Sequence, residues 1–126
     1  MIISFGWTTP ALLAGQKTVT RRDWTWRHAA KFRRGELVAA YDKNPRFGGK
    51  RVAVIRLTQR PILVPLARMP DSDYEAEGFA YMTAHGLRLG VDGPLPTKEY
   101  FEAWRRSGDS MWVVRFEIVE IFPEAR

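Results

Sequence analysis

The sequence contains no cysteine and only two histidines, His28 and His85. Disulfide bonds and thiolate chemistry are therefore excluded, and the lack of cysteine fits a reducing cytoplasm, where we expect the protein to be located. The histidines are isolated, and the acidic cluster of Asp71, Asp73 and Glu75 is typical of helix capping. We therefore expect neither a metal site nor a cofactor.

Long apolar segments are also missing. No window approaches the roughly 20 consecutive apolar residues that a membrane-spanning helix needs. The first residues, Met1–Phe5, lack the charged and then apolar pattern of a secretory signal. A membrane partner is therefore not expected. At 126 residues, with 45% hydrophobic residues, the chain suits one domain with one core, spanning residues 1–126.

The charge is unevenly distributed along the chain. Residues 1–66 carry thirteen Lys and Arg against three Asp and Glu, whereas residues 67–126 carry seven against eleven. The first part thus has a net charge of +10 and the second −4, which together give the +6 of the whole chain. Such asymmetry favours a polyanionic partner, although a generally arginine-rich proteome would also produce a basic chain.

Local patterns predict six strands and three helices, without the alternation typical of parallel α/β folds. We expect a mostly antiparallel α+β domain. The expected strands are Ile2–Phe5, Lys17–Arg22, Leu37–Tyr41, Lys50–Thr58, Met111–Phe122 and, as an edge strand or extended link, Ile62–Val64. The first expected helix begins with a Thr9 cap and ends at Gly15. The second runs from a Ser72–Glu75 capping box to about Ala84, and the third runs from a Thr97 cap to Arg106.

Basic and hydroxyl side chains gather where the first expected helix meets the next strand. Lys17, Thr20 and Arg22 follow Gly15 within seven residues. In a regular strand Thr20 and Arg22 share one face and Lys17 points to the other. The three side chains can meet only if Lys17 still belongs to the turn after Gly15. Otherwise Lys17 is an ordinary solvated lysine and Thr20 a plain strand residue.

The segment Gly15–Arg22 resembles the G-x-K-x-x-T-x-R signature of ASCH domains, which belong to the PUA-like superfamily. Phe32–Val38 and the Glu-Gly-Phe of residues 77–79 also resemble stretches of that family. The resemblance covers most of the chain. It implies a PUA-like, small mixed β-barrel, mostly antiparallel and partly open, with flanking helices.

The resemblance also implies a site. In ASCH relatives that remove the acetyl group from acetylated cytidine, a Lys, a Thr and a Glu are implicated, and Lys17, Thr20 and Glu77 match them. Lys17 would act as base, Thr20 as nucleophile or positioner of water, and Glu77 as proton carrier or orienter. This chain departs from those hydrolases by an extra loop and helix between Gly86 and Arg106 and by a longer β-hairpin tip.

Other residues are candidates for binding a ligand through phosphate contacts or base stacking. Arginines suit phosphate, although Arg22 has an equal alternative as a structural partner of an acid, Glu77 or Asp23. Aromatic residues can stack on a base, although core packing is the more ordinary role for each. The candidates are Arg21, Arg22, Trp24, Trp26, Arg33 and Arg34.

These observations leave three functional hypotheses. The first is an RNA- or nucleotide-binding domain with a ligand cleft at the Gly15–Arg22 junction. The second is a small amidohydrolase that deacylates acetylcytidine-type nucleosides. The third is a ribonuclease, which some ASCH relatives suggest. A closed, narrow pocket favours hydrolysis, whereas an open basic groove favours RNA binding.

Overall fold

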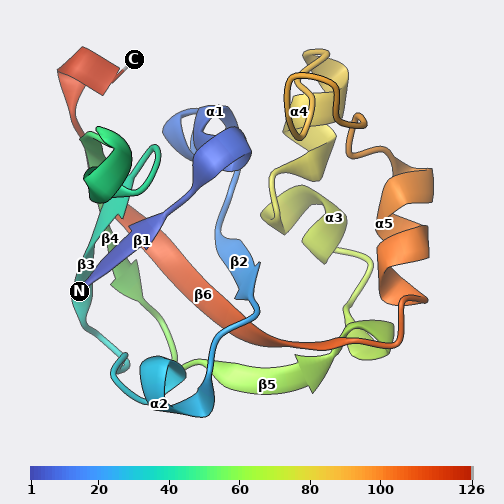
Figure 1. Ribbon diagram of the computed structural model, residues 1–126, viewed down its shortest axis with the longest axis horizontal. Helices are drawn as coiled ribbons and strands as arrows, with labels where there is room; N and C mark the ends of the chain where they lie inside the picture. The colour runs from blue at the N-terminus through green and yellow to red at the C-terminus, as the bar shows by residue number, and fades with distance from the viewer. Residues whose placement is uncertain (126) are drawn as a thin grey trace.

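The computed structural model describes residues 1–125, in which a curled, half-barrel sheet faces a group of short helices (Figure 1). Its strands are β1 (Ile2–Ser4), β2 (Val19–Arg22), β3 (Leu37–Tyr41), β4 (Arg51–Leu57), β5 (Ile62–Pro65) and β6 (Ser110–Ile121). Its α-helices are α1 (Thr9–Leu13), α2 (Trp26–Ala29), α3 (Asp73–Ala76), α4 (Phe79–Ala84) and α5 (Lys98–Arg105). Short 3-10 turns are η1 (Gly6–Thr8), η2 (Pro45–Phe47), η3 (Leu66–Arg68) and η4 (Pro123–Ala125).

The sheet is mixed and mostly antiparallel, which confirms the α+β prediction. Its order is β1-β3-β4-β6-β2, with β5 paired to β6 beside this path. The β1–β3 pair is parallel, and the other pairs are antiparallel. None of the helices within residues 1–125 is both long and apolar enough to cross a membrane.

Strand β6 connects the parts of the sheet. Its first half pairs with β2 and β5, so that Val113 faces Arg21 on one side and Ile62 on the other. Its second half pairs with β4, starting at Phe116. Val114 and Phe116 are buried in the core, and Arg115 points to the opposite face, as strand alternation predicts.

Two clusters of buried apolar side chains stabilise the fold. The larger lies inside the curled sheet and includes Phe5, Leu12, Ile55 and Phe116. The smaller joins Met69, Phe79 and Phe101, which are contributed by the helical part of the chain. The buried polar residues, which include Lys17 and Glu77, are described below with the site.

The predicted helix from Ser72 to Ala84 is wrong as a single element. It is divided into α3 and α4 at Gly78, whose φ of 90° is left-handed. A Cβ at Gly78 would lie 2.6 Å from the Cβ of Ala11, so α1 approaches too closely for any other residue. The capping box is also wrong, because the Ser72 side chain makes no capping hydrogen bond.

The first predicted helix needs a smaller correction. Thr8, not Thr9, precedes α1, because the 3-10 turn η1 leads directly into it. The Thr9 hydroxyl donates a hydrogen bond to the Gly6 carbonyl at 2.7 Å and does not cap free amides. The Thr97 cap of α5 is confirmed, because its hydroxyl accepts a hydrogen bond from the Tyr100 N–H at 3.2 Å.

Candidate functional site

The turn between α1 and β2 places Lys17 outside the strand. Gly15 has a φ of 74°, and β2 begins only at Val19. The N–H of Thr18 donates to the Ala76 carbonyl at 2.8 Å, which ties this turn to the end of α3. The geometric condition for Lys17 to reach the site is therefore met.

Lys17 is buried against Glu77. Its side chain is 1% exposed, and its Nζ donates to the Glu77 carbonyl oxygen at 2.8 Å and to Glu77 Oε1 at 3.0 Å. Both acceptors come from the residue just before Gly78, where the chain leaves α3. The break between α3 and α4 thus presents a backbone and a side-chain acceptor to one amine.

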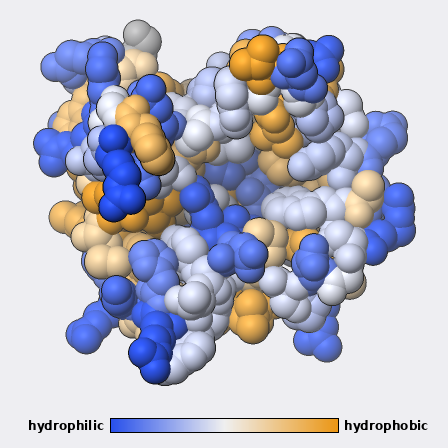
Figure 2. Space-filling view, in the orientation of Figure 1, coloured by the Kyte–Doolittle hydropathy of each residue, from blue (hydrophilic) through white to orange (hydrophobic). Residues whose placement is uncertain are grey.

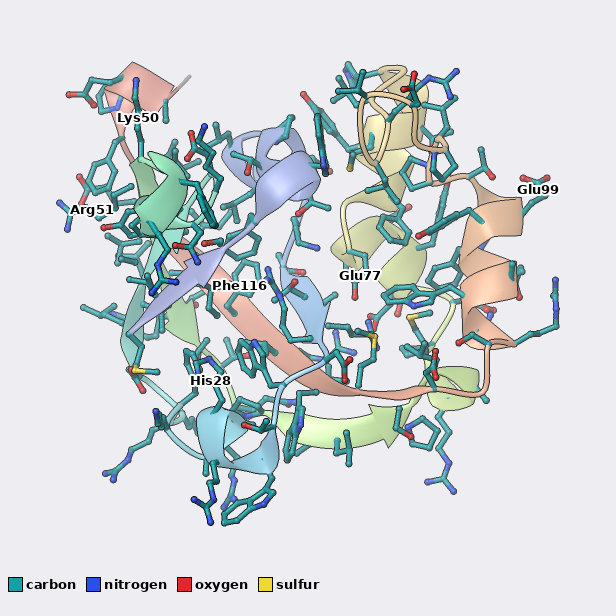
Figure 3. All side chains as sticks on the ribbon, in the orientation of Figure 1. His28, Lys50, Arg51, Glu77, Glu99 and Phe116 are labelled. Carbon is teal, nitrogen blue, oxygen red and sulfur yellow. The ribbon has the colours of Figure 1, made fainter. Side chains whose placement is uncertain are left out.

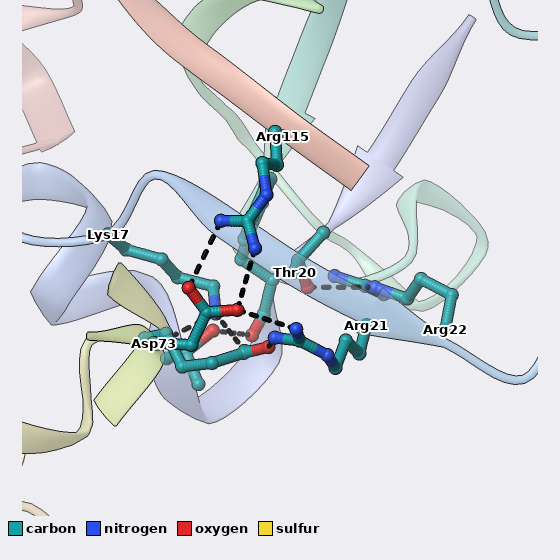
Figure 4. Close-up of polar contacts among 9 residues, drawn as sticks. Lys17, Thr20, Arg21, Arg22, Asp73 and Arg115 are labelled. Atoms are coloured by element: carbon teal, nitrogen blue, oxygen red, sulfur yellow. Dashed lines mark hydrogen bonds and ion pairs between the residues drawn. The ribbon is translucent and has the colours of Figure 1, made fainter. Parts of the chain in front are cut away.

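Asp73 extends this contact into a network that joins two strands to α3 (Figure 4). Arg21 donates from Nη1 to Glu77 Oε2 at 2.8 Å and from Nη2 to Asp73 Oδ2 at 2.5 Å. Arg115 of β6 donates to both oxygens of Asp73, at 3.1 and 2.8 Å. Asp73 and Glu77 are therefore fully engaged by cations in the protein interior.

Positive charge exceeds negative charge in this network. Three cations, Lys17, Arg21 and Arg115, hold the two carboxylates, and Arg22 adds a fourth cation beside them. Arg22 has no acidic partner within residues 1–125: its Nε donates to Thr20 Oγ1 at 3.1 Å, and its guanidinium carbon lies 5.4 Å from the centre of the Phe5 ring. The alternative of an Arg22–Glu77 ion pair is wrong, because Arg21 occupies that position.

Burial shifts the pKa values of two of these cations. Desolvation lowers the pKa of Lys17 below its usual 10.5, partly opposed by Glu77 and reinforced by the charges of Arg22 and Arg21. Desolvation also lowers the pKa of Arg22, again opposed by Glu77. Arginine stays charged even so, whereas the lysine amine is made easier to deprotonate.

A cavity of about 230 Å³ opens onto the network. Lys17, Thr20, Arg22 and Glu77 line its polar side, and Phe5, Phe79, Leu89 and Trp104 line its apolar side. Figure 2 shows a hydrophilic hollow in the middle of this face, and Figure 3 places Glu77 beside it, between the helices and β2. Leu89 and Trp104 belong to the extra segment between Gly86 and Arg106, which therefore forms part of the wall.

The remaining sequence candidates are either tied up in ion pairs or lie outside this cavity. The guanidinium of Arg21 lines the same cavity but is held by Asp73 and Glu77. Trp24 stacks on Phe32, with ring centres 4.6 Å apart, and does not line the cavity. A separate pocket beside α2 contains the other three candidates, Trp26, Arg33 and Arg34.

Sequence reasoning missed Asp73 and Arg115. Asp73 stands in an acidic run that looked like helix capping, so its burial had no local signal. Arg115 offered a weak signal, because it is a cation on the face of β6 opposite the core. Within residues 1–125, no three side chains of His, Cys, Asp or Glu gather as potential ligands of a metal ion.

Comparisons with known proteins give a fold likeness. No family model matches the chain, and no curated protein matches it. Among solved structures, a crystal structure of an Enterococcus faecalis protein assigned to the family DUF984 matches with a TM-score of 0.56 and 18% identity. The match covers 95% of this chain and 76% of that one. At this identity the likeness concerns the fold alone.

Proposed function

We propose that the chain is an ASCH-type domain of PUA-like fold whose cavity binds a nucleotide, free or as one unit of an RNA. The observation that carries this proposal is the guanidinium of Arg22. It lies in the cavity wall with its Nε held by Thr20 and without an acidic partner among the described residues.

Electrostatics supports an anionic ligand. A buried charge is costly unless it is paired; three cations already hold the two carboxylates of the network, and Arg22 beside them adds a cation without a carboxylate partner among the described residues. The hydrogen bond from Nε to Thr20 orients the guanidinium, so its two Nη groups remain for a phosphate, which arginine binds through paired hydrogen bonds.

The apolar wall supports a planar group beside that anion. Trp104, which is partly exposed, offers aromatic surface in the same cavity as Arg22, and the buried rings of Phe5 and Phe79 complete the apolar lining. The volume of about 230 Å³ lies just below the usual range of roughly 300–1,000 Å³ for small-molecule sites. The cavity therefore suits one nucleotide rather than a longer segment of a strand.

Calorimetric titration with nucleoside monophosphates and the matching nucleosides tests this function. We expect the monophosphates to bind more tightly and Arg22→Gln to weaken their binding at least about tenfold, because a charge-assisted phosphate contact is lost. Arg51→Gln is the matched control, since Arg51 also lies over an aromatic ring, Phe122, at 4.8 Å but lines no part of this cavity. Equal affinity for phosphorylated and unphosphorylated ligands would contradict the proposal.

A second candidate function is hydrolysis of an acylated nucleoside. It is favoured by the buried amine of Lys17, whose pKa is lowered, and by the Thr20 hydroxyl, which accepts a hydrogen bond from the Arg22 cation. A neutral Lys17 would take a proton from the attacking Thr20 hydroxyl or water, and the C–N bond would break as the leaving amine gains that proton. Direct attack by water releases the carboxylic acid at once, whereas attack by Thr20 leaves an acyl ester that a water molecule then hydrolyses. Glu77 would hold the Lys17 amine in place through its carbonyl and carboxylate oxygens.

Acetate release from acetylcytidine tests this second candidate. The rate should rise with pH as Lys17 loses its proton, and the rise should lie below the pH at which an ordinary lysine titrates, because the pKa is lowered. Lys17→Ala should abolish turnover. Absence of acetate across a panel of acylated nucleosides would contradict the hydrolase hypothesis. The ribonuclease hypothesis has its own test, because an RNA ladder left intact after long incubation would contradict it.

A further inference from the structure

A second pocket lies beside α2, away from the cavity at Lys17. Its volume is about 450 Å³, within the range of small-molecule sites. Its walls come from α2 and the residues that follow it, from the β4–β5 connection and from β6. Figure 1 shows α2 beside β5, and Figure 3 shows His28 of α2 well separated from Glu77 in the plane of the view.

Three arginines line this pocket: Arg33, Arg34 and Arg60. None of them forms an ion pair within residues 1–125. The nearby carboxylate of Glu36 accepts a hydrogen bond from the backbone N–H of Arg33 at 3.0 Å, and so is engaged by the main chain. The pocket therefore presents unneutralised positive charge from two segments of the chain.

Trp26 presents a large aromatic surface next to these cations. Its side chain is 67% exposed, which is unusual for tryptophan. The Arg27 guanidinium lies 5.5 Å from its ring centre, and the Thr25 hydroxyl caps α2 by accepting from the His28 N–H. The ring is thus supported on a capped helical turn while most of its surface stays free.

The floor of the pocket is rigidly packed. Phe32 is buried and stacks on Trp24. Trp112, which also lines the pocket, donates from its indole N–H to the Trp24 carbonyl at 2.9 Å. The floor of the pocket is therefore built from packed aromatic side chains, whereas its rim carries the exposed Trp26 and arginines.

We infer that this pocket is a second binding site, in which a base of single-stranded RNA stacks on Trp26 while Arg33, Arg34 and Arg60 contact its phosphates. Aromatic stacking surfaces interleaved with cations are the usual means of binding single-stranded nucleic acid. A concave pocket with arginines on both sides suits this ligand better than a membrane surface, which favours a flat face. The choice of RNA as the ligand rests on the proposed nucleotide-binding function. The pocket itself, with its arginines and exposed tryptophan, is observed independently of that proposal.

Strand β2 connects the two sites along the chain. Lys17 precedes the strand, Thr20 lies in it, and Trp26 follows its end. An RNA strand long enough to reach both sites would place one nucleotide in the cavity and another in the pocket. Such two-point contact would give longer RNAs a higher affinity than a mononucleotide has.

Fluorescence anisotropy with a labelled oligouridylate tests the inference. Trp26→Ala should weaken binding at least about fivefold, as loss of a stacked base does. Arg60→Gln should reduce the slope of log affinity against log salt by about 0.7, the value for one phosphate contact in a single strand. Phe47→Ala and Arg46→Gln are matched controls: both residues lie in the basic β3–β4 tip, and Phe47 is 71% exposed.

The outcomes separate this inference from the proposed function. If Trp26→Ala weakens oligouridylate binding while Arg22→Gln leaves mononucleotide binding intact, the second binding site is supported and the proposed function of the cavity at Lys17 is contradicted. If Trp26→Ala binds like the wild type, or if Phe47→Ala weakens binding equally, the pocket is overturned. Binding to phosphatidylserine vesicles through Trp26 without binding to oligouridylate would assign the pocket to a membrane and also overturn the inference.

Discussion

Asp73 holds two arginines that belong to different strands. Its carboxylate accepts from Arg21 of β2 and, through both oxygens, from Arg115 of β6. Through Arg21 it also fixes the position of Glu77 and so of the Lys17 amine. Asp73 lines no cavity with the candidate site residues, so its role is to position them.

Removing the charge of Asp73 should lower the free energy of unfolding. Asp73→Asn leaves Arg21 and Arg115 without their common carboxylate, and breaking a buried ion pair typically costs about 3–5 kcal/mol of unfolding free energy. Urea unfolding followed by circular dichroism measures the loss. Asp71→Asn is the matched control, since Asp71 also pairs with an arginine, Arg105, but is 80% exposed. Similar losses in the two variants would contradict the positioning role.

One part of this network is predictable from the sequence and the other is not. Lys17, Thr20 and Glu77 could be named because a short signature and a Glu-Gly-Phe stretch mark them. Asp73 and Arg115 could not, because their pairing depends on how α3 packs against β6, across 42 residues of sequence. Local patterns carry no information about which exposed-looking acid the fold will bury.

At the scale of the element, the break between α3 and α4 positions Glu77 and Lys17 in the candidate site. Gly78 lets the chain turn sharply after Glu77, and its lack of a Cβ allows α1 and Lys17 to approach. Sequence patterns predict one continuous helix here because an interior glycine weakens a helix by only about 1 kcal/mol. The deciding factor is tertiary: a side chain at this position would collide with Ala11.

Gly78→Ala tests this role. It should destabilise the protein by more than about 1 kcal/mol, because a left-handed φ is unfavourable for alanine and the new Cβ would lie 2.6 Å from the Ala11 Cβ. Gly86→Ala is the matched control: its φ is 67°, but no atom lies within 4 Å of an added Cβ. Thermal unfolding of both variants should show the larger loss for Gly78→Ala, and equal losses would mean that conformational strain alone matters.

At the scale of the whole molecule, β6 and the ion network join the two apolar clusters. β6 contributes Val114 and Phe116 to the larger cluster, and its Arg115 contacts Asp73 at the start of the helical part. The two clusters share no residue, so β6 and the Arg115–Asp73 contact are what link them, and the single domain expected from length and composition stays a prediction.

The two clusters should consequently unfold together. Tryptophan emission, which reports on Trp104 beside the smaller cluster and on Trp24 beside the larger, should follow the same urea transition as far-ultraviolet circular dichroism. Repeating the measurement on Trp104→Phe removes the contribution of the smaller cluster from the emission. Separate midpoints for the two signals would show that the helical part unfolds independently.

The order of synthesis gives the Arg115–Asp73 contact one more consequence. Lys17 and Arg21 are made early, Asp73 and Glu77 much later, and Arg115 later still. While the ribosome is still adding residues before β6, the emerging chain holds these charges without their final arrangement, and β2 lacks its pairing strand. A nascent chain should therefore be unable to hold a ligand at Lys17 until Arg115 of β6 has left the ribosome and can pair with Asp73.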